Sequence, residues 1–572
     1  NRFLQKKNFK AAEVICYKIL SVDKNHFDSI SLLANIFGVN GDYLKAKEFL
    51  NKAIKIQPNN TSILNNLGTA SKEMGELNEA ISFYKKVLEI DSNNVNANFN
   101  LGLIFYNSNE LAKAKNLLEK VIQIQPNYAM AHFNLGNLQK EFKQLKEAKI
   151  SYLKAIELKS NFGNAYNNLG LVFYEIGNSK EAIKYYNKAI EINPKHAGAY
   201  NNLGRIYTET GDFEKAISSH QAASKLEPEN LMHNFYLSEL KKDFLDTKLK
   251  KEIEKNLENN PPKSNLVFGN FLLSRYVQKE KSYQKEIDYL TKAHNYYFDL
   301  KGEKFKLGIK YCFEDVLQVA NFIEFEPNEE NNDSKIKPIF IIGVPRSGST
   351  LVEKVISSGK KSIPMGEEIS VLEHFVNNKI LEKKSFNLGK IKSFRDEIID
   401  IYKEKNLINQ EKESIFTDKS LNNFFYLKII NQVFSGAKVI NCKRNVLASI
   451  MSIYQNNLTE LAWAHDLENI FKYFDNYFQL IEKFKKQYPG FIYDLDFEKF
   501  TNEPEIESKK LMKFCDLPWD KKCLEFYKRK DILSKTTSRQ QIRKAIYKNT
   551  VDRYLPYKTF LDKYGDKYSW YI

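Results

Sequence analysis

The 572-residue chain has few cysteines and no long apolar run. An uninterrupted stretch of about 18 apolar residues would predict a membrane span, and no such stretch occurs. The odd number of cysteines and their spacing match neither a zinc site nor a disulfide framework, which favours a reducing compartment and predicts a cytoplasmic location. The cysteines are Cys16, Cys312, Cys442, Cys515 and Cys523.

The chain also lacks any block of charge of one sign. Lys and Arg number 87 against 71 Asp and Glu, which gives a net charge of +16, but basic and acidic residues alternate. We therefore expect a solvated surface and no nucleic-acid partner. The length exceeds what a single core holds, so several domains are expected. Because the sequence begins at Asn1 rather than Met, it can be a fragment, and a lost leader would leave no trace in it.

Two columns of small residues repeat every 34 positions over the first 230 residues. This period, with prolines closing some units, is typical of tetratricopeptide repeats, in which small residues stand where two helices cross closely. We predict six full repeats from about Ser31 to Asn230, preceded by half a repeat. The glycine column is Gly68, Gly102, Gly136, Gly170 and Gly204, with Ala34 in the same slot. The alanine column is Ala12, Ala46, Ala80, Ala114, Ala148, Ala182 and Ala216.

An asparagine column follows the same period. An amide both donates and accepts, so a ladder of amides can pair with the backbone of an extended peptide in the concave groove of a solenoid. The alternative is that these asparagines are structural. The column resembles the asparagine ladder in the repeat domain of the O-linked N-acetylglucosamine transferase, which implies a protein or peptide partner. Its members are Asn66, Asn100, Asn134, Asn168 and Asn202.

The pattern changes twice further along the chain. Residues 231–337 are helical in pattern but off period, with Gly269 in the glycine slot of a degraded repeat, and Glu326–Lys335 is expected to be a linker. From residue 338, the short apolar run PIFIIG precedes a helical segment, and AKVINC followed by NVLASIMSIYQNNL repeats this form. Such alternation predicts an α/β domain with a parallel sheet. We therefore divide the chain into domains at 1–230, 231–337 and 338–572.

The stretch IIGVPRSGSTLVE, Ile341–Glu353, places Gly343 and Gly348 as a phosphate-binding loop does, but Ser349 stands where the nucleotide-triphosphate loop has lysine. Backbone N–H groups at such a strand-to-helix turn converge on an anion. Arg346 adds a cationic fork suited to tetrahedral oxyanions. Because no lysine or acidic metal ligand accompanies the loop, we expect anion binding without a metal. Three hydroxyls are further donors: Ser347, Ser349 and Thr350.

GVPRSGSTL resembles the 5′-phosphosulfate loop of sulfotransferases, in particular tyrosylprotein sulfotransferases and the bacterial enzymes that join tetratricopeptide repeats to a sulfotransferase domain. The resemblance extends from about Pro338 to the C-terminus. It implies an all-α tetratricopeptide solenoid followed by an α/β P-loop-like sulfotransferase domain, with 3′-phosphoadenosine 5′-phosphosulfate as co-substrate. Further segments fit family motifs in the same order: MGEE at Met365–Glu368, FTDK at Phe416–Lys419, KVINCKRNVLASIMS at Lys438–Ser452, and the C-terminal LPWDKKCLEFYKRK and SRQQIRKAIYKNTVDRY.

The resemblance assigns roles to individual residues. Glu368 is the candidate general base, although the family has one residue fewer between loop and acid pair, so Glu367 stays open. Arg346 and Lys419 would neutralise charge on the bridging oxygen and the sulfo group. The 5′ end of the nucleotide would lie on Arg346, Ser347, Gly348, Ser349 and Thr350. The 3′-phosphate would lie on Arg444 and Ser452, with Ser449 as a substitute. Ser538 and Arg543 match further nucleotide-binding positions, with Lys544 and Lys548 as basic alternatives.

One position departs from the family. A motif that often reads Tyr-Glu-Asp-Leu has Phe497 at the tyrosine position in DLDFEKF, which removes a hydroxyl contact and keeps a ring. His374 and His465 are tempting as bases but lie in no matching motif, so a structural role is expected. Cys442 is expected in the core.

The sequence thus predicts a two-domain sulfotransferase whose repeats recruit a protein or peptide, with tyrosine as the first choice of acceptor and a carbohydrate hydroxyl as the second. One rival is a nucleotide or phosphoryl-transfer enzyme with an altered loop. The other is a repeat scaffold with an inactive nucleotide domain.

Overall fold

The computed structural model describes residues 9–324, 336–381, 391–408, 414–529, 541–546 and 552–571. The chain separates into two compact units, Asn1–Leu203 and Gly204–Ile572, and each is described by itself. The domain boundaries at 230 and 337 stay predictions. The predicted linker Glu326–Lys335 lies outside the described residues.

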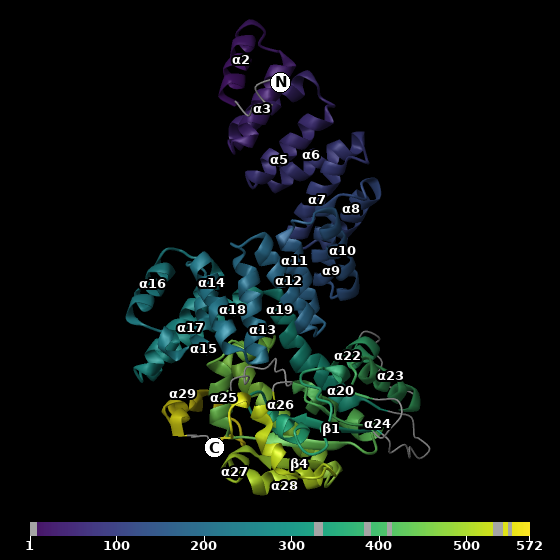
Figure 1. Cartoon of the computed structure of the whole chain (residues 1–572), viewed down its shortest axis with the longest axis vertical. Coiled ribbons are helices and arrows are strands. Elements are labelled where there is room, and N and C mark those ends of the chain that lie inside the picture. The colour runs from purple at the N-terminus through teal and green to yellow at the C-terminus, as the bar shows by residue number, and fades with distance from the viewer. Residues whose placement is uncertain are drawn as a thin grey trace. The chain divides into compact units, whose positions relative to one another are not determined.

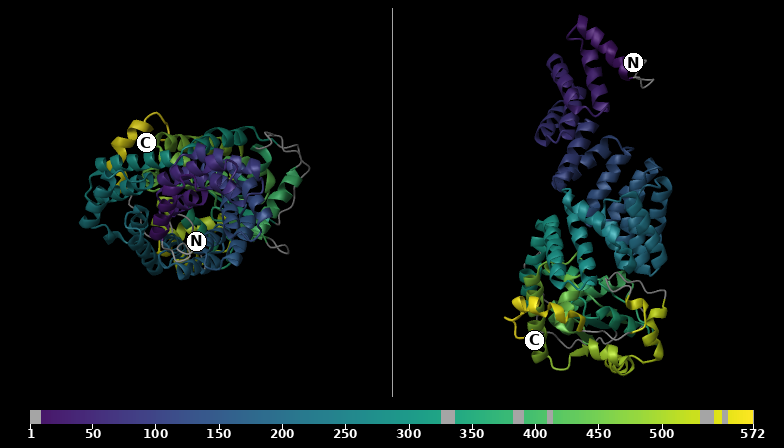
Figure 2. Two further views of the ribbon diagram at one scale, coloured as in Figure 1. Left: turned by 90° about the horizontal axis from the view of Figure 1, so that it is seen from above. Right: turned by 90° about the vertical axis from the view of Figure 1, so that its left-hand side faces the viewer.

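The first unit is a series of antiparallel helix pairs (Figures 1 and 2). In the first unit, α2 precedes the pairs from α3 to α12 and α13 begins, whereas the end of α13 and all of α14 fall in the second unit. Along the described sequence, the six pairs from α3 to α14 after the unpaired α2 agree with the predicted six repeats preceded by half a repeat. The helices are α2 (Phe9–Val22), α3 (Phe27–Val39), α4 (Tyr43–Ile56), α5 (Thr61–Glu73), α6 (Leu77–Ile90), α7 (Val95–Asn107), α8 (Leu111–Ile124), α9 (Ala129–Glu141), α10 (Leu145–Leu158), α11 (Gly163–Glu175), α12 (Ser179–Ile192), α13 (Ala197–Thr210) and α14 (Phe213–Leu226).

Side-chain caps fix where several of these helices begin. Asp42, Asn60 and Asn178 each accept a hydrogen bond from the backbone N–H three residues later, at 3.1 Å. A capped first turn satisfies a donor that the helix itself leaves unpaired. The capping residues in the turns therefore help to define where each repeat begins, in addition to the small residues on the helix faces.

The glycine column holds space for an aromatic ring. A Cβ atom on Gly170 would lie 2.6 Å from the ring of Tyr186, and one on Gly136 would lie 2.8 Å from the ring of Tyr152. Both tyrosines are fully buried. Gly102 is looser, since its nearest neighbour would be Leu117 at 3.4 Å. The helices cross closely at these glycines, as the sequence predicted, and a tyrosine ring fills the space that a larger side chain would need.

The second unit begins with helices that continue the solenoid pattern. α17 and α18 pair as the degraded repeat predicted, and a Cβ on Gly269 would lie 2.8 Å from Leu257. The helices before the sheet are α15 (Leu231–Leu240), α16 (Thr247–Glu258), α17 (Lys263–Lys279), α18 (Tyr283–Lys301), α19 (Glu303–Lys310) and α20 (Val316–Phe322). The turn Tyr311–Asp315 between the last two is a π-helix.

A four-stranded parallel sheet of order β2-β1-β3-β4 forms the centre of the second unit, which confirms the predicted α/β fold. The strands are β1 (Ile336–Ile342), β2 (Ser414–Asp418), β3 (Lys438–Lys443) and β4 (Ile492–Asp496). The helices that follow them or link them are α21 (Ser349–Ser357), α22 (Val371–Val376), α23 (Ile391–Glu404), α24 (Leu427–Val433), α25 (Val446–Tyr454), α26 (Leu467–Gln487), α27 (Phe497–Asn502), α28 (Pro504–Phe514) and α29 (Lys558–Gly565). In Figure 1, α27 and α28 lie beside β4.

Both faces of the sheet are buried. Along β1, Ile339 and Ile341 join the apolar cluster formed with α21 and α28, whereas Phe340 and Ile342 join the larger cluster on the other face. Successive side chains of a strand point to opposite faces, so this alternation is what a sheet covered on both sides requires. The carboxyl ends of β1, β2 and β3 therefore meet at one edge, where the loop of interest begins.

Polar contacts join α18 to the α/β part of the same unit. His294 of α18 lies with its Nδ1 2.9 Å from Nδ1 of His465 and its Nε2 2.7 Å from the carbonyl oxygen of Tyr454. Burial lowers the pKa of His294 to about 4 and that of His465 to about 3. Nearby, Glu286 accepts a hydrogen bond from Tyr557 at 2.7 Å. His465 is thus a core residue, in keeping with the structural role expected of it. Among the described residues, no helix is both apolar enough and long enough to span a membrane.

Candidate active site

The loop after β1 has the backbone strain and the close packing of an anion-binding turn. Gly348 has φ +95°, and a Cβ there would lie 2.1 Å from the ring of Phe497. Arg346 also lies in the left-handed region, at φ +70°, which non-glycine residues adopt mainly where their surroundings impose it. The ring that replaces the family's tyrosine therefore packs directly on the loop.

One hydroxyl of the loop is buried without a partner. Ser347 is fully buried, and its Oγ has no hydrogen-bond partner among the described residues. Buried polar groups are nearly always satisfied, so an orphaned hydroxyl needs an explanation. An anion seated in the turn would supply the missing acceptor. Thr350 and Ser349 follow in the first turn of α21 and are also buried.

The residues predicted to bind the 5′ end and the 3′-phosphate of the nucleotide are in direct contact with one another. The Nε of Arg346 donates to Oγ of Ser452 at 2.9 Å, and Nη1 of Arg444 donates to the carbonyl oxygen of Arg346 at 2.6 Å. The Arg444 guanidinium lies 5.4 Å from the centre of the Phe497 ring. The hydroxyl of Ser449 donates instead to the carbonyl of Asn445 inside its own helix, so Ser452 is the serine that faces the loop.

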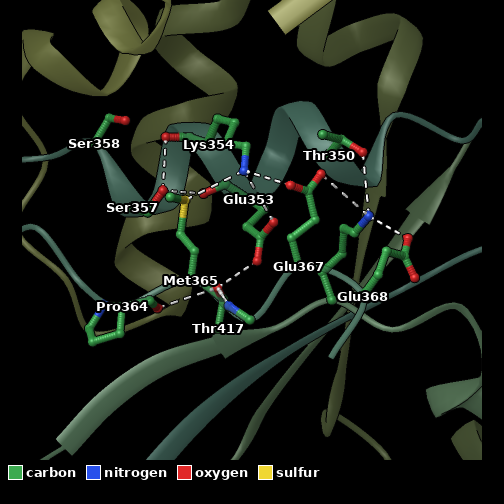
Figure 3. Close-up of polar contacts among 12 residues, drawn as sticks. Thr350, Glu353, Lys354, Ser357, Ser358, Pro364, Met365, Glu367, Glu368 and Thr417 are labelled. Atoms are coloured by element: carbon green, nitrogen blue, oxygen red, sulfur yellow. Dashed lines mark hydrogen bonds and ion pairs between the residues drawn. The ribbon is translucent and has the colours of Figure 1, made fainter. Parts of the chain in front are cut away.

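The acid pair lies beside the end of β2. The segment before α22 runs alongside this strand, and the N–H of Glu368 donates to the carbonyl oxygen of Lys419 at 2.8 Å. The Nζ of Lys419 lies 2.6 Å from Oε1 of Glu368 and 3.5 Å from Oγ1 of Thr350 (Figure 3). This lysine therefore links the acid pair to the first turn of the loop helix.

The two glutamates differ in surroundings. Glu367 lies with Oε2 3.2 Å from the Nζ of Lys354 and Oε1 3.9 Å from the Nζ of Lys419, and its side chain is 9% exposed. The side chain of Glu368 is 28% exposed and pairs with Lys419 alone among the ion pairs of the described residues. Glu367 is thus held between two cations, whereas Glu368 reaches solvent.

Burial and charge act in opposite directions on Lys419. Burial alone would lower its pKa, but the carboxylates of Glu368, Glu367 and Glu353 outweigh burial and hold the pKa above its ordinary value. Lys419 therefore stays an ammonium group throughout the neutral range. A fixed, buried cation beside a candidate anion-binding loop is suited to stabilising growing negative charge.

Glu353, Lys354 and Thr417 are site residues that sequence reasoning missed. The Oγ1 of Thr417 donates to Oε1 of Glu353 at 2.7 Å, and Lys354 reaches Glu367. The sequence predicted a helical segment after the loop but gave no role to its charged residues, and Glu353 and Lys354 are 0% and 1% exposed. Their burial could have been expected, because a helix that directly follows the loop after β1 must pack against the sheet.

The remaining residues singled out in the sequence have the following surroundings. Arg543 donates to the carbonyl oxygens of Arg529 at 2.9 Å and Thr210 at 3.2 Å, and Lys544 is exposed. Ser538 and Lys548 lie outside the described residues. His374 is exposed on α22. Cys442 is buried in β3, and burial raises the pKa of its thiol to about 12.

The asparagine column of the first unit is half-buried, and several of its amides bond to neighbouring repeats. Asn66 donates to Asn35 at 3.0 Å, and Asn168 donates to Asn137 at 2.8 Å. Asn202 donates to Asn167 at 3.0 Å, while Asn134 donates to a carbonyl of its own helix, that of Met130, at 2.8 Å. Part of the donor capacity of the column is therefore structural. Asn100 occupies the same half-buried position.

Comparison with known families agrees with both halves of the chain. Residues 70–109, 95–128, 129–162 and 162–226 match tetratricopeptide repeat models, and residues 5–87 match a model of subunit 3 of the anaphase-promoting complex, or cyclosome. Residues 338–521 match the sulfotransferase family. The chain thus joins tetratricopeptide repeats to an α/β domain with a parallel sheet. That domain is a sulfotransferase-family domain.

Individual relatives cover parts of the chain. An uncharacterized protein of Aquifex aeolicus (strain VF5) is 30% identical over 341 residues, which are 56% of this chain and 44% of that protein. The chain therefore spans less than half of this curated relative. Among solved structures, MamA is 30% identical over 29% of this chain and 96% of its own, with a TM-score of 0.27. YrrB, described as a tetratricopeptide protein with an unusual peptide-binding site, is 26% identical over 32% of this chain and 95% of its own, with a TM-score of 0.28.

Proposed function

We propose that the chain is a sulfotransferase that moves a sulfo group from 3′-phosphoadenosine 5′-phosphosulfate to an acceptor hydroxyl. The observation that carries the proposal is the junction of Arg346, Ser452 and Arg444 at the loop, with the Lys419–Glu368 pair beside its first helical turn. Two neighbouring anion-binding sites, one at the loop and one at Arg444 and Ser452, suit a nucleotide that carries negative charge at both of its ends. A serine in the lysine position of the loop disfavours triphosphate chemistry.

The residues present fit this nucleotide. The orphaned hydroxyl of Ser347 and the backbone N–H groups of the turn would hold its 5′ end, because the glycine at 348 lets the backbone take the required conformation. Arg444 and Ser452 would hold the 3′-phosphate. When bound, the nucleotide supplies an activated sulfo group. Arg346 and Lys419 then present fixed cations to the charge that grows on the oxygens.

Glu368 is the better candidate for the general base. Its side chain is partly exposed, so an acceptor hydroxyl can approach it, whereas the side chain of Glu367 is enclosed by two lysines. Glu368 would take the proton from the attacking hydroxyl. A positioned base of this kind contributes roughly 10²- to 10⁴-fold to the rate.

The acceptor class is also part of the proposal. We favour a tyrosine of a protein or peptide over a carbohydrate hydroxyl, since a tetratricopeptide solenoid suits an extended chain in its groove. The partly exposed asparagine column would bind the peptide through those amide donors and acceptors that are not used in hydrogen bonds between the repeats. A cytoplasmic location fits the five cysteines, which are buried and unpaired.

Calorimetry with 3′-phosphoadenosine 5′-phosphate and with ATP tests the nucleotide assignment. The bisphosphate should bind more tightly than ATP to the wild type. Arg444→Ala should weaken bisphosphate binding about 10- to 100-fold, since a charge-assisted hydrogen bond contributes about 1.5–3 kcal/mol. Lys443→Ala is the matched control, because Lys443 is the adjacent cation and its side chain is 52% exposed. Equal or tighter binding of ATP, or an equal loss in both variants, would remove the assignment.

A further inference from the structure

A buried ion cluster extends from the proposed catalytic pair into α21. Glu353 and Lys354 are 0% and 1% exposed in the middle of this helix, where charged side chains are rarely found unless they are paired. The Nζ of Lys354 lies 3.8 Å from Oε2 of Glu353 and 3.2 Å from Oε2 of Glu367. Figure 3 shows these side chains converging beneath the first turn of the helix.

Glu367 joins this inner pair to the proposed catalytic pair. Its two carboxylate oxygens point to different lysines, Oε2 to Lys354 at 3.2 Å and Oε1 to Lys419 at 3.9 Å. The ion pairs thus form one series of alternating charge, which runs from Glu353 through Lys354, Glu367 and Lys419 to Glu368. A change of charge at one end of this series alters how strongly each lysine is attracted to its carboxylates, because each lysine is shared between two of them.

The cluster has one carboxylate more than it has cations. Two lysines face three glutamates, so the group carries one negative charge unless one carboxyl is protonated. Glu353 is the most deeply buried of the three, and the hydroxyl of Thr417 holds its Oε1 at 2.7 Å. Burial raises the pKa of Glu353 to about 7, and Glu367 adds to this rise while Lys354 and Lys419 oppose it.

We propose that Glu353 and Lys354 are positioning residues of the transfer site, which act through Glu367 to set how firmly Lys419 is held toward Glu368 and the loop. This inference rests on the proposed function. With a neutral Glu353, Glu367 no longer competes with a second carboxylate for Lys354, and Lys419 stays close to Glu368 and to a bound anion. With an ionised Glu353, Lys354 is shared, and Glu367 draws Lys419 away from the loop. An extra negative charge also stands near the anion site.

The sign of the resulting pH dependence follows from this chain of contacts. A carboxyl whose pKa is raised keeps its proton below about pH 7 and loses it above. Affinity for an anionic nucleotide should therefore fall as the pH rises through about 7, and so should the turnover.

Two further carboxyls, those of Asp418 and Glu373, feel the charge of Glu368, and burial raises their pKa values as well. The comparison with Glu353→Gln therefore isolates the part of the pH dependence that belongs to Glu353. The elements packed against α21 contribute the following groups. The side chains of α28 that are buried against the neighbouring core are Ser508, Leu511 and Met512. In the 3₁₀ turn Lys521–Lys528, burial raises the pKa of the Cys523 thiol further above neutrality. Arg543, in the short turn Gln541–Arg543 that packs near α21, stays charged at any ordinary pH.

The test is calorimetry with 3′-phosphoadenosine 5′-phosphate at pH 6 and pH 8 on the full chain. Between these values the wild type should lose roughly three- to tenfold in affinity relative to Glu353→Gln, whose amide keeps the Thr417 contact but cannot ionise. Glu286→Gln is the matched control, because Glu286 is 1% exposed and its partners are neutral side chains. It should keep the wild-type pH dependence.

Lys354→Met separates positioning from simple charge. Loss of the cation should raise the pKa of Glu353 further, so adding Glu353→Gln to Lys354→Met should change affinity less than twofold at either pH. Non-additivity of this kind marks residues that act through one another. If Glu353→Gln does not fold, Glu367→Gln replaces it, and the same loss of pH dependence is expected. With the 5′-phosphosulfate and a tyrosine-containing peptide, kcat of Glu353→Gln should persist above pH 7 where that of the wild type declines.

The outcomes distinguish the two proposals. Tight bisphosphate binding with the same pH dependence in wild type and Glu353→Gln overturns the inference and leaves the proposed function standing. Full additivity of the two substitutions also overturns it. Absence of bisphosphate binding at both pH values overturns both proposals together.

Discussion

Polar side chains are used differently in the solenoid and around the loop. In the solenoid, an amide donates to an amide of the preceding repeat, as Asn66 does to Asn35 and Asn168 to Asn137. Around the loop, two lysines and three glutamates share one cluster. The first arrangement spreads stabilisation over many equivalent contacts. The second concentrates it, so that one substitution changes the state of every neighbour.

Glycine shows the same contrast. Gly170 is needed because a ring fills the place of its side chain, and its backbone is an ordinary helix. Gly348 is needed because its φ of +95° suits a residue without Cβ, in addition to the nearby ring of Phe497. In the solenoid the constraint is packing alone. In the loop the backbone conformation itself is a second constraint.

The largest effect is expected from Glu368→Ala. Turnover should fall roughly 10²- to 10⁴-fold because the acceptor hydroxyl loses its proposed base. The affinity for 3′-phosphoadenosine 5′-phosphate should be kept or rise, because Lys419 loses a competing carboxylate and stays available to the nucleotide. Steady-state rates and calorimetry on the same preparation measure both. Unchanged turnover would exclude Glu368 as the base, and a parallel loss of affinity would show that it acts in binding.

A smaller effect, confined to stability, is expected from Gly170→Ala. The new Cβ would meet the buried ring of Tyr186 at 2.6 Å, and overpacking of this kind costs about 1–3 kcal/mol of unfolding free energy. Gly102→Ala is the control from the same column, since its nearest contact would be 3.4 Å. Denaturant titration should rank the two variants in this order. Equal destabilisation would argue against the ring as the reason for the column.

The smallest effect is expected from Asn168→Ala. The substitution removes the amide contacts to Asn137 at 2.8 Å and to Asn167 at 3.1 Å. Because the position is half-buried and water can replace part of these contacts, the unfolding free energy should fall by about 0.5–1.5 kcal/mol. Denaturant titration measures this loss, with bisphosphate affinity as the internal reference that should not move. A loss of several kcal/mol would contradict the view that the solenoid distributes its stabilisation.

The repeats could be predicted from sequence because their contacts are local. Each glycine, alanine and capping residue recurs at a fixed spacing, and the ring that fills a glycine slot stands 16 residues later in the cases of Tyr152 and Tyr186. The two strands flanked by helices were also predicted from their apolar runs. Local patterns of this kind need no knowledge of the rest of the fold.

The ion cluster could not be predicted in the same way. Glu353 and Lys354 are adjacent in a helix, and such a pair ordinarily faces solvent. Their burial depends on the sheet covering one side of α21 and α28 the other, and on the segment Pro364–Glu368 running beside β2. These contacts join residues more than 50 positions apart in sequence, as Thr417 and Glu353 are. Motif resemblance located Lys419 and Glu368 without revealing what holds them.

The contacts of α18 bear on how this protein can be dissected. Tyr454 and Gln455 lie at the end of the helix that carries Ser452, and they bond to His294 and Glu286 respectively. A fragment that starts where the sulfotransferase match starts, at residue 338, would strip this end of its anchors and open an aromatic and imidazole core to water. Truncation for expression or crystallisation should therefore retain the chain from before α17, since the packing of the sulfotransferase-family domain includes helices that the repeat pattern alone would assign to the solenoid.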